Sequence, residues 1–157
     1  MDKIRGFEVV SSFSDINLPK RSTARSAGYD FEAAEDITVP SIWKLALKGS
    51  ENIKPTFIKT GVKAYMQEDE ALFLYNRSSN PGKKGLVMAN SVGVVDSDYY
   101  NNADNEGHIM FAFYNFFPVD VTIKKGDRIG QGVFKKFLKA DGDDAAAIRT
   151  GGFGSTK

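Results

Sequence analysis

The sequence predicts an all-β fold, either a sandwich, a jelly roll or a small barrel. Short runs rich in β-branched and aromatic residues follow one another along the chain, and turn-forming residues separate them. No stretch shows the apolar repeat of a long amphipathic helix. The 157 residues suffice for one domain that buries about two-thirds of its unfolded surface.

The expected elements follow in chain order. Residues 57–66 predict a pair of strands or one strand bulged around Gly61, because a glycine interrupts the run. Residues 41–48 are either a helical turn or an edge strand, and residues 49–52 form a loop. The remaining strands are expected at residues 7–10, 36–40, 71–75, 109–116, 119–123 and 128–137.

Residues 90–100 are the most informative stretch. Valines on both sides of Gly93 favour a strand, and Asp96 follows them. The pattern predicts a strand turning into a hairpin, with an open backbone edge near Gly93 and Asp96 aimed across the turn. Judged by spacing alone, Asp96 is either an inward carboxylate with a chemical task or an ordinary turn residue.

Composition excludes several classes of site. The chain has no cysteine, which removes disulfides and thiolate chemistry, and His108 is its one histidine, which removes histidine-rich zinc sites. Its net charge of +1 gives no overall field toward nucleic acid or membrane. The longest nearly apolar run, residues 109–117, is too short to cross a bilayer, and no signal peptide opens the chain. We therefore expect a cytoplasmic protein.

Two further phosphate-binding classes are not supported. The lysines near Gly82 lack the earlier glycine and the following hydroxyl of a Walker-type loop. Lysine pairs at residues 83–84 and 135–136 are typical of solvated strand or loop ends, so no direct nucleic-acid binding is expected.

The last 18 residues differ in character from the rest of the chain. Residues 140–157 are small, charged and glycine-rich, whereas residues 1–139 form the expected β domain. Such an end either frays or acts as a lid. In a lid, glycine N–H groups would wrap an anion, Ser155 and Thr156 would donate hydroxyls, and Phe153 would stack on a planar ring.

Five sequence blocks, taken together, resemble the homotrimeric dUTPases, the dUTP pyrophosphatases. The most specific blocks are Gly-Val-Val-Asp-Ser-Asp-Tyr at residues 93–99 and Gly-Gly-Phe-Gly-Ser-Thr at residues 151–156. The other three are Ala-Gly-Tyr-Asp at 27–30, Asn-Arg-Ser-Ser at 76–79 and Arg-Ile-Gly-Gln at 128–131. The resemblance runs from about residue 24 to the end of the chain. It is nearest to the phage-encoded members from Gram-positive hosts.

The resemblance implies a jelly-roll subunit in a homotrimer, with sites at the subunit interfaces. The glycine-rich arm of one subunit would close over a site built by the others. The implied reaction is hydrolysis of dUTP to dUMP and pyrophosphate with Mg²⁺ on the triphosphate. It limits uracil incorporation into DNA and supplies dUMP.

The resemblance also assigns roles to individual residues. Asp96 matches the general base that takes a proton from the attacking water. Asp30 matches a residue that orders the water shell of the metal or a neighbouring arginine, and Arg128 is either a phosphate ligand or part of a structural ion pair. Tyr99 matches the ring that packs on the deoxyribose, although a core tyrosine is the alternative. The matched substrate-binding residues are Arg77, Ser78, Ser79, Asn90, Gly93, Val95, Tyr99, Gln131, Arg149, Phe153, Gly154, Ser155 and Thr156.

The chain also departs from the family pattern. Residues 41–53 lengthen one connection, residues 100–108 form an extra polar loop, Gly130 stands where alanine is common, and Thr150 where glycine is common. The extra loop is either a tolerated surface insertion or a surface that binds a repressor of mobile genetic elements. A regulatory interaction protein on the same scaffold is therefore the alternative function. A dCTP deaminase shares the fold but would need a catalytic acid in place of the uracil-reading pattern.

Overall fold

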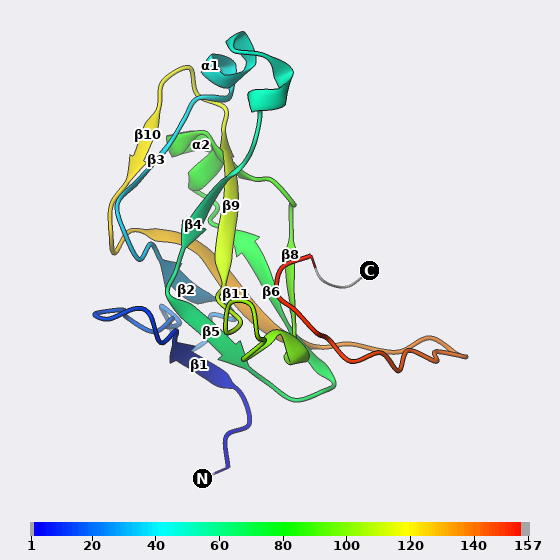
Figure 1. The fold of residues 1–157 in the computed structure, drawn as a ribbon. Coiled ribbons are helices and arrows are strands. Elements are labelled where there is room, and N and C mark those ends of the chain that lie inside the picture. Colours follow the sequence, from blue (N-terminus) through cyan, green and yellow to red (C-terminus); the bar gives the residue numbers. More distant parts are fainter. Residues whose placement is uncertain (1, 155–157) are drawn as a thin grey trace.

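The computed structural model describes residues 2–154, which form a mostly β fold (Figure 1). The strands are β1 (Gly6–Val9), β2 (Tyr29–Glu32), β3 (Ile37–Val39), β4 (Thr56–Lys59), β5 (Val62–Tyr65), β6 (Glu70–Asn76), β7 (Leu86–Met88), β8 (Gly93–Asp96), β9 (Met110–Asn115), β10 (Val121–Ile123) and β11 (Arg128–Lys136). The helical segments are short: α1 (Ile42–Leu47), α2 (Asn80–Lys84) and the 3₁₀ turns η1 (Ser50–Asn52) and η2 (Ser97–Tyr99). The all-β prediction is confirmed.

The strands form a sandwich built from antiparallel pairs. One sheet has the order β2-β11-β6-β8 and the facing sheet the order β4-β9-β7, while β1 pairs with β5 and β10 with β3. The two larger sheets meet through Phe31 of β2 and Phe111 of β9, whose ring centroids lie 5.5 Å apart. The largest fully buried hydrophobic side chains are Phe31, Phe111, Phe113, Ile58, Leu72, Leu86, Ile109, Ile123 and Ile129.

Gly61 separates two strands that belong to different sheets. The predicted strand pair at residues 57–66 exists, but β4 pairs with β9 and β5 pairs with β1, so the two do not form a hairpin. Gly61 has φ +69°, a conformation that glycine adopts without steric cost, and its N–H donates to His108 Nε2 at 2.9 Å. The chain therefore changes sheets at this glycine.

Of the two short helices, α1 decides between the two predictions for residues 41–48, and α2 is an element that the sequence analysis did not predict. Residues 41–48, open between helix and edge strand, contain α1, and the expected loop at 49–52 contains η1. Helix α2 was not predicted. Its local signals are Pro81 in the first turn and Gly85 as a left-handed C-cap with φ 66°. No helix among residues 2–154 has the length and apolar character needed to span a bilayer.

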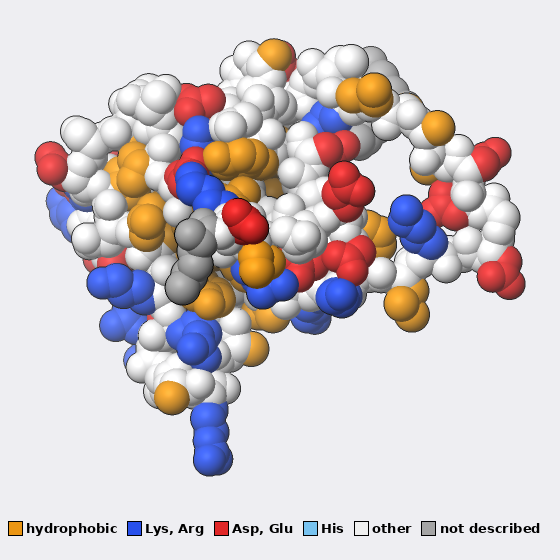
Figure 2. Space-filling model, turned by 90° about the horizontal axis from the view of Figure 1, so that it is seen from below, with side chains coloured by type: hydrophobic (Ala, Val, Ile, Leu, Met, Phe, Trp, Pro, Cys, Tyr) orange, Lys and Arg blue, Asp and Glu red, His pale blue; other side chains and the backbone are white. Residues whose placement is uncertain are grey.

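After β11 the chain leaves the sandwich. Residues 137–154 contain no helix or strand, and Figure 1 shows this segment running outward and then returning toward β8. Figure 2 shows the same excursion from below, with acidic side chains at its far end. These agree with the exposed Asp141, Asp143 and Asp144. The boundary between β domain and arm at residue 139 remains a proposal.

Gly130 of β11 packs directly against the Phe111 ring of the facing sheet. A Cβ atom at this position would lie 2.1 Å from Cε1 of Phe111, which is itself fully buried. The departure from the common alanine therefore has a physical cause. The Phe111 ring occupies the space that a methyl group would need.

We predict that Gly130→Ala lowers the free energy of unfolding by about 1–3 kcal/mol, because the added methyl overpacks the core. In a Phe111→Leu background the same substitution costs less, since the clashing ring atom is gone. Gly82→Ala is the matched control, because a Cβ there meets nothing within 4 Å. Urea denaturation of the four variants measures these differences. An equal cost of Gly130→Ala with Phe111 or Leu at position 111 would contradict the explanation.

Candidate active site

The site is built on β8, an edge strand of the four-stranded sheet. β8 pairs with β6 so that Gly93 lies opposite Leu74 and Asp96 opposite Ala71. The predicted hairpin is wrong: β8 runs into η2 and a loop, and its partner strand precedes it in the chain. The predicted open edge near Gly93 is present, because β6 covers only one side of β8. β8 pairs with β6, which is distant in sequence, and not with a strand that directly follows it across a turn.

The β8 register decides which side chains of the strand face the hydrophobic core and which face outward. Gly93 and Val95 are buried, whereas Val94 and Asp96 are exposed. The alternation follows the two-residue period of a strand. Val95 lies opposite the fully buried Leu72, so the apolar contact between them holds Asp96 on the outer face.

A cavity of about 160 Å³ lies between β8, β9 and the returning arm. Eight of the predicted catalytic and substrate-binding residues line it. These are Asn90, Gly93, Val95, Asp96, Tyr99, Arg149, Phe153 and Gly154. The sequence reasoning missed five other lining residues: Leu74, Val94, His108, Ile109 and Met110. Leu74 could have been predicted only from the pairing register of β6 and β8, in which it lies opposite Gly93. No local sequence pattern indicates that register.

Gly93 lies close to its cross-strand neighbour Leu74. A Cβ atom on Gly93 would lie 3.0 Å from the Cβ of Leu74. The absence of a side chain leaves the backbone of β8 accessible from the cavity. Fixed N–H and C=O groups at such an edge can hydrogen-bond a planar base.

Tyr99 is both a core residue and a wall of the cavity. Its side chain belongs to the main hydrophobic cluster, and its hydroxyl donates to the carbonyl of His108 at 2.8 Å. The same hydroxyl accepts from Asn105 Nδ2 at 2.9 Å. Burial raises the pKa of the Tyr99 phenol above its usual value. The ring is thus fixed in place, with its hydroxyl engaged inside the protein.

Asp96 meets the arm of its own chain. Arg149 Nη2 lies 2.7 Å from Asp96 Oδ2, and Arg149 Nε lies 2.8 Å from Asp98 Oδ1. The Arg149 side chain is 8% exposed and the Asp96 side chain 52%. The guanidinium lies 5.7 Å from the centroid of the Tyr99 ring. Hydrogen bonding to Asp98 and the charges of both carboxylates raise the pKa of Arg149.

Phe153 lies at the mouth of the cavity. Its ring packs edge to face on Phe57 with the centroids 5.7 Å apart, and the side chain remains largely exposed. The position is compatible with the predicted stacking on a planar ring. Ser155 and Thr156, predicted to bind phosphate, lie outside the described residues.

The predicted phosphate-binding residues form a second cluster around β6, β11 and β2. Gln131 Nε2 donates to the carbonyl of Asn76 at 3.3 Å, and Arg77 Nη1 donates to the carbonyl of Arg128 at 3.3 Å. Ser78 is exposed, and Ser79 is the N-cap residue that precedes α2. A Cβ on Gly28 would lie 2.2 Å from Gln131 Oε1, so the glycine makes room for this glutamine.

Arg128 and Asp30 form an ion pair in this second cluster. Their closest N and O atoms are 3.5 Å apart, which favours the structural reading of Arg128. Among residues 2–154 no three acidic or histidine side chains gather as a metal site.

The two clusters lie apart within one chain. Asp96 is opposite Ala71, and Arg77 follows the other end of β6 after Asn76. Ala71 and Asn76 are five residue steps apart along the strand, about 17 Å at roughly 3.3 Å per step. Arg77, Ser78, Ser79, Gln131 and Asp30 do not line the cavity beside Asp96. One copy of the chain therefore presents two separate parts of the predicted site.

Comparison with known proteins identifies the family. A family model described as dUTPase matches residues 14–157. A deoxyuridine 5'-triphosphate nucleotidohydrolase of Lactococcus lactis is 56% identical over 159 residues, and the alignment covers 98% of each chain. The chain belongs to the dUTPase family.

Solved dUTPase structures share the fold. A crystal structure of dUTPase from Streptococcus mutans has a TM-score of 0.78 and 47% identity, and the match covers 87% of this chain and 99% of that one. A dUTPase of Staphylococcus bacteriophage 80alpha has a TM-score of 0.71 at 18% identity, with 94% and 99% covered. The predicted dUTPase-type jelly roll is confirmed. The phage origin of this family member remains a prediction.

His108 lines the cavity and also accepts a hydrogen bond that contributes to the stability of the fold. The ring is buried, and Nε2 accepts a hydrogen bond from the Gly61 N–H, which requires the neutral imidazole. Burial lowers the pKa of His108 below its usual value. The unfolded chain therefore binds the proton more readily than the folded chain does.

We predict that the free energy of unfolding falls as the pH drops through about 6.5, the ordinary histidine pKa, toward the lower pKa of the folded state. Because His108 is the chain's one histidine, His108→Gln should remove most of this slope between pH 5.5 and 7. Urea denaturation at several pH values gives the measurement. An unchanged slope in the variant would assign the effect to other groups.

Proposed function

We propose that this chain hydrolyses dUTP to dUMP and pyrophosphate, which limits uracil incorporation into DNA and supplies dUMP. The observation that carries the proposal is the position of Asp96. Its exposed carboxylate stands at a cavity whose wall is the open edge of β8. The family membership and the 56% identity to a nucleotidohydrolase support the same conclusion.

The cavity is suited to a base with a deoxyribose. The backbone edge at Gly93 would offer fixed donors and acceptors to the uracil. The exposed Asn90 and the buried Val95 line the same cavity. The fixed ring of Tyr99 would pack on the sugar where a 2′-hydroxyl would stand. Shape alone discriminates against a 5-methyl group by about 1–3 kcal/mol, so the backbone hydrogen bonds must carry part of the selectivity.

Asp96 would act as the general base. Its carboxylate would take a proton from the water that attacks the α-phosphorus in line with the leaving pyrophosphate. In this structure Arg149 holds Asp96, so the guanidinium must first move. The triphosphate offers Arg149 bidentate, more highly charged acceptors than two carboxylates do. Substrate binding would thereby release the base and bring the arm over the nucleotide.

The second cluster would hold the triphosphate. Arg77 and Gln131 present N–H donors, and Ser78 and Ser79 present hydroxyls that can stabilise charge on the leaving pyrophosphate. Mg²⁺, when bound on the phosphates, would neutralise part of their charge, and Asp30 would hold a water of its shell. The roles of Gly154, Ser155 and Thr156 in closing the site are part of the same proposal.

We also propose that the active assembly is a homotrimer. The separation of the two clusters within one chain supports this, because a single nucleotide must contact both. A cavity from one copy placed against the Arg77 cluster of another would complete the site, as symmetric assembly allows. The cytoplasm is the expected location.

The regulatory alternative is not favoured. Every described site residue carries the functional group that the reaction needs, and the relatives are nucleotidohydrolases. The loop at residues 100–108 as a repressor-binding surface stays a prediction. The polar groups of that loop are largely engaged within the chain, as described below.

Pyrophosphate release from dUTP, dTTP, dCTP and UTP with Mg²⁺ tests the proposal. We expect turnover of dUTP alone, and a decrease in kcat of about 10²–10⁴-fold in Asp96→Asn, the usual range for a general base. Asp98→Asn is the matched control, because Asp98 also contacts Arg149 but does not line the cavity. It should retain most of the activity. No turnover of dUTP by the intact chain, or an equal loss in both variants, would refute the assignment.

A further inference from the structure

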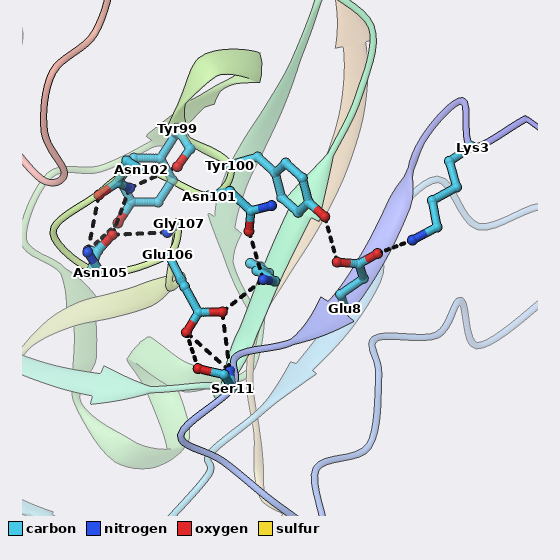
Figure 3. Close-up of polar contacts among 11 residues, drawn as sticks. Lys3, Glu8, Ser11, Tyr99, Tyr100, Asn101, Asn102, Asn105, Glu106 and Gly107 are labelled. Carbon is cyan, nitrogen blue, oxygen red and sulfur yellow. Dashed lines mark hydrogen bonds and ion pairs between the residues drawn. The ribbon is translucent and has the colours of Figure 1, made fainter.

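The extra loop at residues 100–108 is fastened to the β domain at one side by Glu106. The carboxylate accepts hydrogen bonds from Lys63 Nζ at 2.8 Å and from the backbone N–H of Ser11 at 3.2 Å (Figure 3). The Ser11 hydroxyl donates to it as well. These bonds, that from Lys63 first, lower the pKa of Glu106 to about 2. The loop is therefore tied to β5 and to the segment after β1.

A second set of bonds holds the start of the loop. Asn101 Oδ1 accepts from Lys63 Nζ at 2.7 Å, and the Tyr100 hydroxyl donates to Glu8 Oε2 at 2.6 Å. Figure 3 shows Glu8 also reaching Lys3, with which it forms an ion pair. Both flanks of the loop are thus anchored. A freely moving surface insertion would not need such contacts.

Inside the loop two asparagines connect its turn to Tyr99. Asn102 Oδ1 accepts from the backbone N–H groups of Asp104 and Asn105 at 3.0 and 3.1 Å. Asn102 Nδ2 donates to Asn105 Oδ1 at 2.8 Å, and Asn105 Nδ2 donates to the Tyr99 hydroxyl. The loop and the ring that lines the cavity form one hydrogen-bonded unit.

The arm docks on this unit at Gly152. The Gly152 N–H donates to Asp104 Oδ2 at 2.7 Å. Gly151 and Gly152 are buried, whereas residues 140–148 before them are all exposed. A Cβ on Gly152 would lie 3.1 Å from Asn102 Oδ1 and 3.2 Å from Asn105 Cγ, so only a glycine fits without displacement of these side chains.

We propose that the loop at residues 100–108 is the docking platform of the arm, with Asp104 and Asn105 as positioning residues for the hydrolysis proposed above. The platform fixes the arm backbone at Gly152, between Arg149 and Phe153. It thereby sets where the guanidinium and the aromatic ring stand over the cavity. Asn105 of the same loop also donates a hydrogen bond to the Tyr99 hydroxyl. The loop would therefore position both the arm and the ring that contacts the sugar.

The proposal rests on the proposed function only for its kinetic consequence. The docking itself is a contact between a carboxylate and a backbone N–H, and it is measurable without substrate. It is also independent of which copy of the chain supplies the arm to a given loop. The ligand of the platform is a segment of this chain, residues 151–152.

Hydrogen–deuterium exchange of the arm tests the docking in the full-length protein without nucleotide. We expect Asp104→Ala to speed exchange at residues 151–153 about tenfold, which corresponds to loss of one charge-assisted hydrogen bond. Asp104→Asn keeps an acceptor oxygen and should restore most of the protection. Gly152→Ala changes only the arm and should speed exchange in the same way. Asp141→Ala, in the exposed part of the arm, is the control and should exchange as the unmodified chain does.

Steady-state kinetics with dUTP tests the positioning role. We expect Asp104→Ala and Gly152→Ala to raise KM about tenfold with a smaller change in kcat, because the reacting groups at Asp96 are intact. Unchanged arm exchange in Asp104→Ala, or an equal change in Asp141→Ala, would overturn the docking. Faster arm exchange with unchanged kinetics would overturn the positioning role. Absence of dUTP turnover in the unmodified chain would refute the proposed function and leave the exchange result to decide the docking.

Discussion

The pairing register between β8 and β6 is the constraint on which the candidate site depends. Val95 packs opposite Leu72 on the core face, and the two-residue period of the strand then places Asp96 on the outer face. A slip by one residue would bury the carboxylate and expose the valine, at the cost of an unpaired buried charge. The apolar core thus fixes the orientation of the group proposed to do the chemistry. Gly93 belongs to the same constraint, because a Cβ there would make a tight 3.0 Å contact with Leu74.

The cavity acquires its second wall from the segment that follows β8 and from the C-terminal arm. Tyr99 is held by the carbonyl of His108 and the amide of Asn105, so the loop that follows the strand also fixes the ring. The same loop receives the backbone of Gly152 and is itself tied to Lys63 through Glu106. Fold, loop and arm are therefore coupled through hydrogen bonds, and the insertion is an integrated part of the site.

The sequence predicted what local patterns control. The strand content, the open edge near Gly93 and the grouping of Asp96 with Tyr99 follow from residue types and from the family motifs. The false hairpin after Asp96 shows the limit, because the real partner of β8 is a strand that lies earlier in the chain. The burial of His108 was hidden for the same reason: its acceptor role depends on the N–H of Gly61, which is 47 residues away. Pairing register and sheet-to-sheet contacts join residues far apart in the chain, so local patterns in a single sequence do not reveal them.

The central claim is that one chain carries two parts of a site that only a second copy can complete. Mixing two impaired variants, Asp96→Asn and Arg77→Ala, after joint unfolding and refolding tests it most directly. In a shared site, some mixed assemblies pair an intact Asp96 cavity from one variant with an intact Arg77 cluster from the other. We therefore predict that dUTP hydrolysis in the mixture rises well above the residual rate of either variant refolded alone. A mixture as inactive as its components, in assemblies shown to contain both variants, would contradict the account.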